Sequence, residues 1–225
     1  ITVEGRRLRL SGTRRDHCRV GKASFLMTQI NYGPFESVLE LAPGFNLSMT
    51  KAAYLNGFLR LDIPGVPPLP RDVPHSSVGR EGSVRPWVPN TDAYTTDSGL
   101  VIKVELAGVR SDTIEIICEA NRLQISGTRP DDCQLAKLVK EINYGPYKTV
   151  MELPSNYDLN RAKAAYLNGF LRIDIPEGPS APSLRRRAVQ PVEVDTNEVA
   201  LDYVAMNNRA LPGIHVLNTG YGDLG

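Results

Sequence analysis

The sequence carries almost no net charge and contains no long apolar run. Its 26 Lys and Arg residues nearly balance its 25 Asp and Glu residues, which leaves a formal net charge of +1. This balance gives no electrostatic attraction to nucleic acid or to an acidic membrane surface. No apolar run approaches the roughly 18 residues that a helix needs to cross a bilayer. An apolar content of 41% and a charged content of 23% are typical of a soluble globular protein.

Cysteine and histidine are scarce, and their wide spacing matches neither a disulfide framework nor a zinc site. A reducing cytoplasm is the location that this cysteine usage predicts. Two of the cysteines fall at equivalent positions of a repeat described below. We interpret them as inert loop thiols, with a redox link as the alternative. The scarce residues are Cys18, Cys118, Cys133, His17, His75 and His215.

The motifs of common enzyme classes are also missing. No glycine-rich loop ends in Lys-Ser or Lys-Thr, and neither Ser11-Gly12 nor Ser126-Gly127 sits in a nucleophile elbow. Aromatic residues make up 7% of the chain and are not interleaved with a basic stripe, which argues against single-stranded nucleic acid as a ligand. We therefore predict a protein that is not an enzyme and that uses no cofactor or metal.

What the chain does have is a repeat. Residues 51–64 and 163–176 are identical except that Leu61 is replaced by Ile173. Within each copy an Asn-Gly dipeptide, which supplies the positive φ angles of a tight turn, separates two runs of strand-forming residues. Each copy is therefore predicted to form a β-hairpin that ends at a proline.

The similarity extends beyond the hairpin. Residues 1–18 match residues 116–133, and Ile-Asn-Tyr-Gly-Pro recurs at 30–34 and 142–146, as expected after duplication of a domain. In front of the second copy, residues 92–95 and 100–106 predict two more strands that the first copy lacks. We expect either that the chain is a fragment of a longer protein, which we favour, or that another chain supplies the missing strands.

Short predicted strands follow one another in the second copy at 92–95, 100–106, 114–118, 123–125, 147–153, 162–166 and 170–175. Turn residues separate them, which predicts an antiparallel β-sandwich. One short helical turn is expected within residues 155–163, capped by Ser155 or Asp158. The domain boundaries predicted are a partial domain at 1–64, a Pro-rich linker at 65–86, a complete domain at 87–178, and a flexible tail at 179–225.

A series of motifs identifies the family that the second copy resembles. They are Trp87-Val88-Pro89 with Asp92-Ala93-Tyr94, Leu106-Ala107-Gly108-Val109, Leu123-Gln124-Ile125-Ser126-Gly127, and Ala164 with Asn168-Gly169-Phe170-Leu171. The last signature recurs in the first copy as Ala52, Asn56, Gly57 and Leu59. In this order the motifs resemble those of the α-crystallin domain of small heat-shock proteins, with Ala107 in place of the usual proline.

This resemblance implies an all-β, immunoglobulin-like sandwich that dimerises and holds unfolding proteins without ATP. In the bacterial and plant type, a loop strand swaps onto the partner subunit. Here that dimer loop is residues 129–145, and the dimer contact is alternatively expected within one chain. The swapping piece is expected around Leu135, Leu138 and Val139.

The resemblance also implies an apolar groove at a sheet edge, which takes extended client segments or a tail motif by strand addition. The alternative role for each groove residue is ordinary core packing. As tail motif we predict Val192 and Val194, with Ile214 to Val216 as runner-up and an ordinary loop as the alternative. The groove residues expected are Ile114, Ile116, Cys118, Ala162, Ala164 and Tyr166, with Ile1, Val3, Ala52 and Tyr54 in the first copy.

The leading functional hypothesis is an ATP-independent chaperone whose partners are unfolding client proteins and copies of itself. Under this hypothesis we expect the groove to be accessible to client segments. The alternative hypothesis is a protein-interaction module that docks on one specific partner.

Overall fold

The computed structural model describes residues 1–16, 23–65, 85–131, 141–178, 187–193 and 217–218. The regular structure of these residues consists of β-strands and three short 3₁₀ turns. None of the helices among them is long and apolar enough to span a bilayer. The predicted linker at 65–86 lies almost entirely outside the described residues. The predicted swapping piece at Leu135, Leu138 and Val139 lies wholly outside them.

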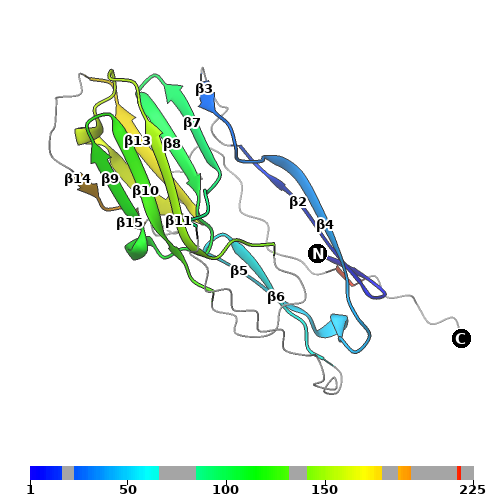
Figure 1. Ribbon diagram of the computed structural model, residues 1–225. Coiled ribbons are helices and arrows are strands. Elements are labelled where there is room, and N and C mark those ends of the chain that lie inside the picture. The colour runs from blue at the N-terminus through cyan, green and yellow to red at the C-terminus, as the bar shows by residue number, and fades with distance from the viewer. Residues whose placement is uncertain (17–22, 66–84, 132–140, 179–186, 194–216, 219–225) are drawn as a thin grey trace, which may run out of the picture.

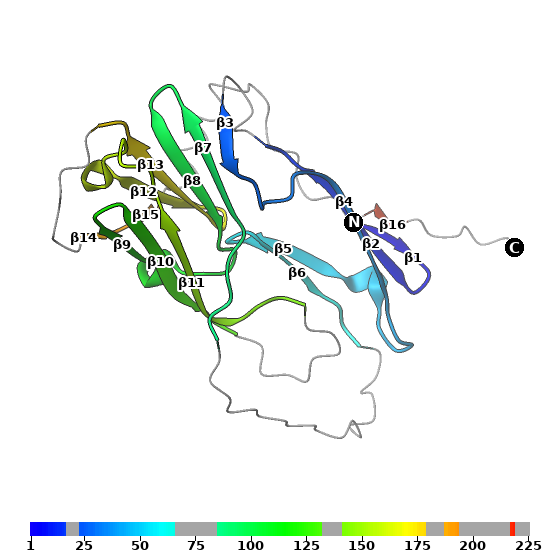
Figure 2. The same ribbon diagram turned by 45° about the horizontal axis from the view of Figure 1, so that its top comes forward.

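The second repeat forms the β-sandwich that the sequence predicts (Figures 1 and 2). Its strands pair antiparallel, apart from one parallel contact between β12 and β15. One sheet has the order β11 (Gly145–Glu152), β10 (Arg122–Arg129), β9 (Glu115–Glu119), β14 (Arg187–Val189). The other has the order β15 (Val192–Glu193), β12 (Lys163–Leu167), β13 (Phe170–Pro176), β8 (Gly99–Glu105), β7 (Thr91–Thr96), β3 (Ser24–Met27).

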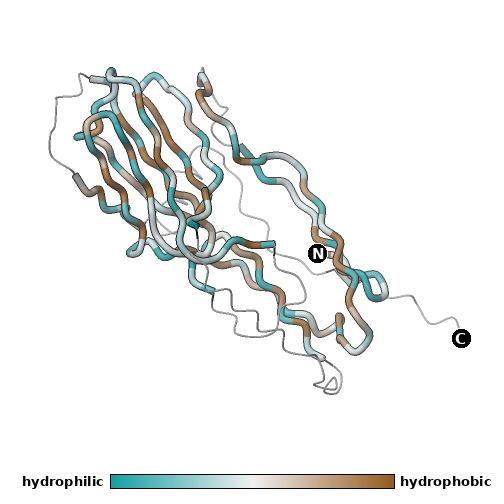
Figure 3. The backbone as a smooth tube through the Cα atoms, in the orientation of Figure 1, coloured by the Kyte–Doolittle hydropathy of each residue, from teal (hydrophilic) through white to brown (hydrophobic). Residues whose placement is uncertain are grey.

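Alternating side chains fill the space between these two sheets. Leu171, Ile173 and Ile175 of β13 are at most 1% exposed and pack in one cluster with Leu123 and other residues of the facing sheet. Figure 3 shows apolar and polar positions alternating along these strands. The period of two in the sequence therefore places the core correctly.

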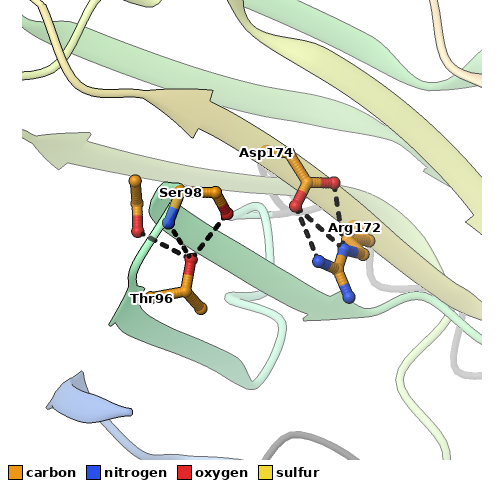
Figure 4. A network of polar contacts seen from close by, with 5 residues as sticks. Thr96, Ser98, Arg172 and Asp174 are labelled. Carbon is orange, nitrogen blue, oxygen red and sulfur yellow. Dashed lines mark hydrogen bonds and ion pairs between the residues drawn. The ribbon is translucent and has the colours of Figure 1, made fainter. Parts of the chain in front are cut away.

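The outward face of β13 carries polar groups instead. Arg172 and Asp174 form an ion pair with an N–O distance of 2.7 Å, and both side chains are 47% exposed (Figure 4). At the nearby turn between β7 and β8, the amide of Ser98 donates a hydrogen bond to Oγ1 of Thr96. An ion pair this exposed contributes little to stability.

Both repeated hairpins have the predicted Asn-Gly turn. Asn56 and Gly57 have φ angles of 48° and 82°, and Asn168 and Gly169 have φ angles of 48° and 78°. Positive φ at both central residues is the geometry that matches the twist of the flanking strands. The first hairpin consists of β5 (Lys51–Leu55) and β6 (Phe58–Asp62).

The predicted helical turn is a 3₁₀ turn at Leu159–Arg161, labelled η3. Of the two expected caps, Asp158 is the one used, because its Oδ1 accepts a hydrogen bond of 2.9 Å from the amide of Asn160. Its other oxygen pairs with Nε of Arg161 at 2.9 Å. The two remaining 3₁₀ turns are η1 (Leu47–Met49) and η2 (Ser111–Thr113).

The first repeat has a much smaller core. β1 (Thr2–Glu4), β2 (Arg7–Arg14) and β4 (Gly33–Glu40) form one sheet, with β16 (Leu217–Asn218) parallel to β1. The hairpin β5–β6 is a separate two-stranded sheet. Among the described residues, the buried cluster between these elements consists of Val3, Leu8 and Leu47, with partly buried side chains packed against it.

The first repeat has the smaller core because the outer edge of β6 lacks a partner strand among the described residues. Within the described part of the chain, β6 pairs with β5 alone, whereas β13 also pairs with β8. Leu59 is therefore 39% exposed, while its counterpart Leu171 is fully buried. Phe35 of β4 is 53% exposed, while its counterpart Tyr147 is 1% exposed.

The two repeats contact each other within the chain. Strand β3, from the long loop of the first repeat, pairs antiparallel with β7 of the second (Figures 1 and 2). Oδ1 of the buried Asp92 accepts hydrogen bonds from the amides of Gln29 and Ile30, at 2.7 and 2.9 Å. A loop strand of the first repeat thus crosses onto the second repeat, while the swapping piece expected in the loop of the second repeat lies outside the described residues and stays a prediction.

Candidate functional site

The predicted groove corresponds to the two neighbouring sheet edges formed by β9 and β12. All six groove residues predicted in the second repeat are buried, with exposures of 8% or less, and all belong to its single core cluster. They line the inside of the sandwich between the edges, so ordinary core packing is part of their role. These residues are Ile114, Ile116, Cys118, Ala162, Ala164 and Tyr166.

Tyr166 fixes the position of β12 at this edge. Its ring is 3% exposed, and its hydroxyl lies 2.9 Å from the carbonyl of Leu106 and 2.8 Å from that of Val109. The hydroxyl donates a hydrogen bond shared between these two oxygens, which ties β12 to the turn after β8. A buried hydroxyl needs such a partner, because burial without one is costly.

Residues 187–193 of the same chain cover both edges. β14 pairs antiparallel with β9, with Val189 opposite Ile116, and β15 pairs parallel with β12, with Val192 opposite Ala165. The side chain of Val189 is 7% exposed and packs in the core cluster. The accessible groove expected from the sequence is therefore covered in this structure, and these residues are strands rather than irregular tail.

The predicted tail motif is placed only in part. The backbone of Val192 lies beside β12, while Val194 and the runner-up segment 214–216 lie outside the described residues. Val189, which fills the groove, was missed by the sequence analysis. The signal for it is the apolar pair Ala188-Val189 between the charged Arg187 and Pro191.

The corresponding residues of the first repeat are not brought together in the same way. Val3 is 7% exposed and Ile1 packs against the small core, whereas Ala52 is half-buried and Tyr54 is 54% exposed. Tyr54 differs from Tyr166 because, among the described residues, no turn supplies the carbonyls that Tyr166 uses. On the other edge, β16 pairs parallel with β1, with Leu217 opposite Thr2.

Charged groups gather at a different place, where the two repeats meet. Arg14 and Arg129 occupy equivalent positions of the repeat, after Ser-Gly-Thr in each copy. Nη2 of Arg14 donates to Oε1 of Glu105 at 2.8 Å. Arg129 is 7% exposed, and its guanidinium lies 4.2 Å from the ring centroid of Trp87. The repeated Ser-Gly-Thr-Arg segment is the sequence signal that identifies this pair.

Burial controls the protonation equilibria at this contact. Burial lowers the pKa of Arg129, and the nearby Glu105 carboxylate partly offsets that effect. Burial also raises the pKa of the Tyr147 hydroxyl well above its usual range. Within the described residues, no three His, Cys, Asp or Glu side chains cluster as metal ligands would.

Comparison with known proteins relates the second repeat to a protein family. The model of the Hsp20/alpha crystallin family matches residues 92–199. The 18 kDa antigen 2 of Mycobacterium avium is 31% identical over 105 residues, which cover 46% of this chain and 76% of that protein. Small heat shock protein C2 of Rickettsia felis is 31% identical over 93 residues, which cover 40% of this chain and 60% of that protein.

A solved structure gives a similar alignment. HspA from Xanthomonas axonopodis is 29% identical, with a TM-score of 0.40, over 43% of this chain and all of that chain.

Proposed function

Because this chain belongs to the Hsp20/alpha crystallin family, we propose that it is an ATP-independent chaperone that binds partly unfolded proteins and prevents their aggregation. The observation that carries the proposal is the pair of neighbouring strand edges at β9 and β12, which strands of three and two residues cover in the part of the chain that the structure describes. Backbone groups at such edges bind extended segments with little demand on their sequence.

In this proposal the tail segment 187–193 is a reversible cover. A short strand held by few backbone hydrogen bonds and one buried valine opens at a much lower free-energy cost than the whole sandwich. When it opens, β9 and β12 expose backbone groups and the apolar site of Val189. A client segment that has lost its own structure then competes with the tail for the same positions.

The experiment measures light scattering of a heat-denatured model client without ATP. The intact chain is expected to suppress scattering, and Val189→Asp is expected to do so at a lower molar ratio because it releases the cover. Val88→Asp is the matched control, since Val88 is 67% exposed and the same change there leaves the tail in place. If none of the three proteins reduces scattering at equal mass, the chaperone proposal is wrong.

A covered groove is equally consistent with the alternative hypothesis, a protein-interaction module that docks on one specific partner. A pulldown that returns one folded partner, rather than many aggregation-prone proteins, supports the module. Self-association into dimers or larger assemblies, and the cytoplasmic location, stay predictions.

A further inference from the structure

The hairpin turn of the first repeat lies against the turn that follows β8 in the second repeat (Figure 2). The amide of Gly108 in that turn donates a hydrogen bond of 2.8 Å to the carbonyl of Asn56. The ring of Phe58 occupies the place that a side chain at Gly108 would take, so only glycine fits there. A Cβ atom added to Gly57 would lie 3.0 Å from Cβ of Ala107. The first repeat therefore packs closely on the turn after β8.

The same turn holds β12 in place. Its carbonyls at Leu106 and Val109 accept the shared hydrogen bond from the hydroxyl of Tyr166, whose side chain is buried. Between these two carbonyls, Gly108 has a φ angle of 73°. Glycine has more backbone freedom than any other residue, so a turn built on it keeps one shape only where neighbouring contacts restrict it. The contacts with the first repeat supply that restriction.

Tyr166 is also a residue at which the tail covers β12. β15 pairs parallel with β12, with Val192 opposite Ala165 and Glu193 opposite Tyr166. Hydrogen bonds weaken steeply when their geometry is distorted, and a strand of two residues has few of them. A small shift of β12 therefore removes a large part of what holds β15. A series of direct contacts thus leads from the hairpin turn of the first repeat to the tail segment.

We propose that the contact between the repeats controls the cover on the β9–β12 groove. While the first repeat is docked, the turn after β8 holds Tyr166 and keeps β12 in the position that β15 needs. When the first repeat separates, the turn relaxes around Gly108, β12 loosens, and the tail segment 187–193 opens more often. The inference rests on the proposed function for what an open groove does, but the coupling itself is measured without a client. Linkage makes the coupling reciprocal, so release of the tail also weakens the contact between the repeats.

The experiment measures hydrogen exchange by mass spectrometry in the full chain and in Phe58→Ala. This substitution removes the ring that lies against Gly108. Exchange in residues 163–167 and 187–193 is expected to become about fivefold faster or more, which is the usual size of coupling between sites. Exchange in residues 122–127 of the facing sheet is expected to stay unchanged, which separates coupling from a general loss of stability.

Phe35→Ala is the matched control, because it removes a ring from the same repeat. The ring of Phe35 lies against Gly12 of its own repeat and is 53% exposed. This variant is expected to leave exchange at β12 and in the tail segment unchanged. Phe58→Lys is a stronger perturbation of the contact, because the guanidinium of Arg129 lies 5.7 Å from the ring centroid of Phe58 and repels a second cation. It is expected to speed exchange at least as much as Phe58→Ala.

A double-mutant cycle tests the route through Tyr166. In a chain with Tyr166→Phe, the turn no longer has its hydrogen bond to β12, so the addition of Phe58→Ala is expected to have no further effect on residues 187–193. The reciprocal test uses Val189→Asp, which releases the tail. It is expected to speed exchange in residues 24–30, where the first repeat meets β7.

The coupling is overturned if Phe58→Ala and Phe58→Lys both leave exchange in residues 187–193 unchanged, or if Phe35→Ala speeds it equally. An equal rise in residues 122–127, or an undiminished effect of Phe58→Ala in the Tyr166→Phe chain, overturns it as well. Failure of the chaperone proposal is a separate result, because that proposal is tested by light scattering of a heated client. Coupled exchange without suppressed scattering contradicts only the function, and suppressed scattering without coupled exchange contradicts only this inference.

Discussion

The same leucine in two copies of one sequence gives a direct test of the structure. Leu59 and Leu171 occupy equivalent positions in segments that differ at a single residue. Leu171 is fully buried between β8 and β12, whereas Leu59 is 39% exposed at an edge that no described strand covers. The substitutions Leu171→Ala and Leu59→Ala therefore remove the same atoms from the same local sequence in different environments.

The expected costs differ because only Leu171→Ala leaves a cavity. Truncation of a fully buried leucine costs about 2–5 kcal/mol, through lost transfer free energy and the cavity that remains. Truncation at a partly exposed position is expected to cost at most about 1 kcal/mol, since much of the side chain is already in water.

Urea unfolding measures both costs. Trp87 is the only tryptophan, and its ring centroid lies 5.4 Å from that of Tyr147, so its fluorescence reports on the second repeat. Far-UV circular dichroism follows both repeats together. Leu171→Ala is expected to lower the Trp87 midpoint strongly. Leu59 lies in the first repeat, so the cost of Leu59→Ala is measured from the circular dichroism transition, whose midpoint is expected to change little.

Equal destabilisation by the two substitutions refutes this interpretation, because it means that Leu59 is as well covered in solution as Leu171. A cost of Leu59→Ala that grows with protein concentration has a specific meaning. It shows that another copy of the chain covers the edge of β6.

Two further predictions concern single side chains of the second repeat. Tyr166→Phe is expected to lower the free energy of unfolding by about 1–3 kcal/mol, because the buried carbonyls of Leu106 and Val109 lose the hydroxyl donor, although that of Leu106 keeps the amide of Val109. The matched Tyr54→Phe is expected to leave the free energy of unfolding unchanged, and equal effects in urea unfolding contradict this. The hydrogen bond from Arg161 holds the pKa of Asp158 below its usual value, so its stabilising effect is complete above about pH 4 and is lost as the pH falls through the lower, folded-state pKa. Asp158→Asn is therefore expected to flatten the acid side of the stability profile, and an unchanged acid slope argues against this role.

The sequence alone determined the local features of this protein. Asn168-Gly169 and its earlier copy fix two tight hairpins, because their positive φ angles depend on neighbouring atoms only. The alternation of Leu171, Ile173 and Ile175 with polar residues fixes which face of β13 is buried. The motif order then indicated the sandwich, which the structure confirms.

Only the tertiary structure decided the features that depend on distant strands. Leu59 and Leu171 share their local sequence but not their burial, because burial is set by whichever strand pairs on the far side of the hairpin. For the same reason the apolar pair at Ala188-Val189 and the repeated Ser-Gly-Thr-Arg segment mark these residues in the sequence, but only the fold shows that Val189 fills the groove and that Arg14 meets Glu105. Strand pairing between distant segments uses backbone groups that every residue carries, so the partner of an edge is fixed by the assembled fold.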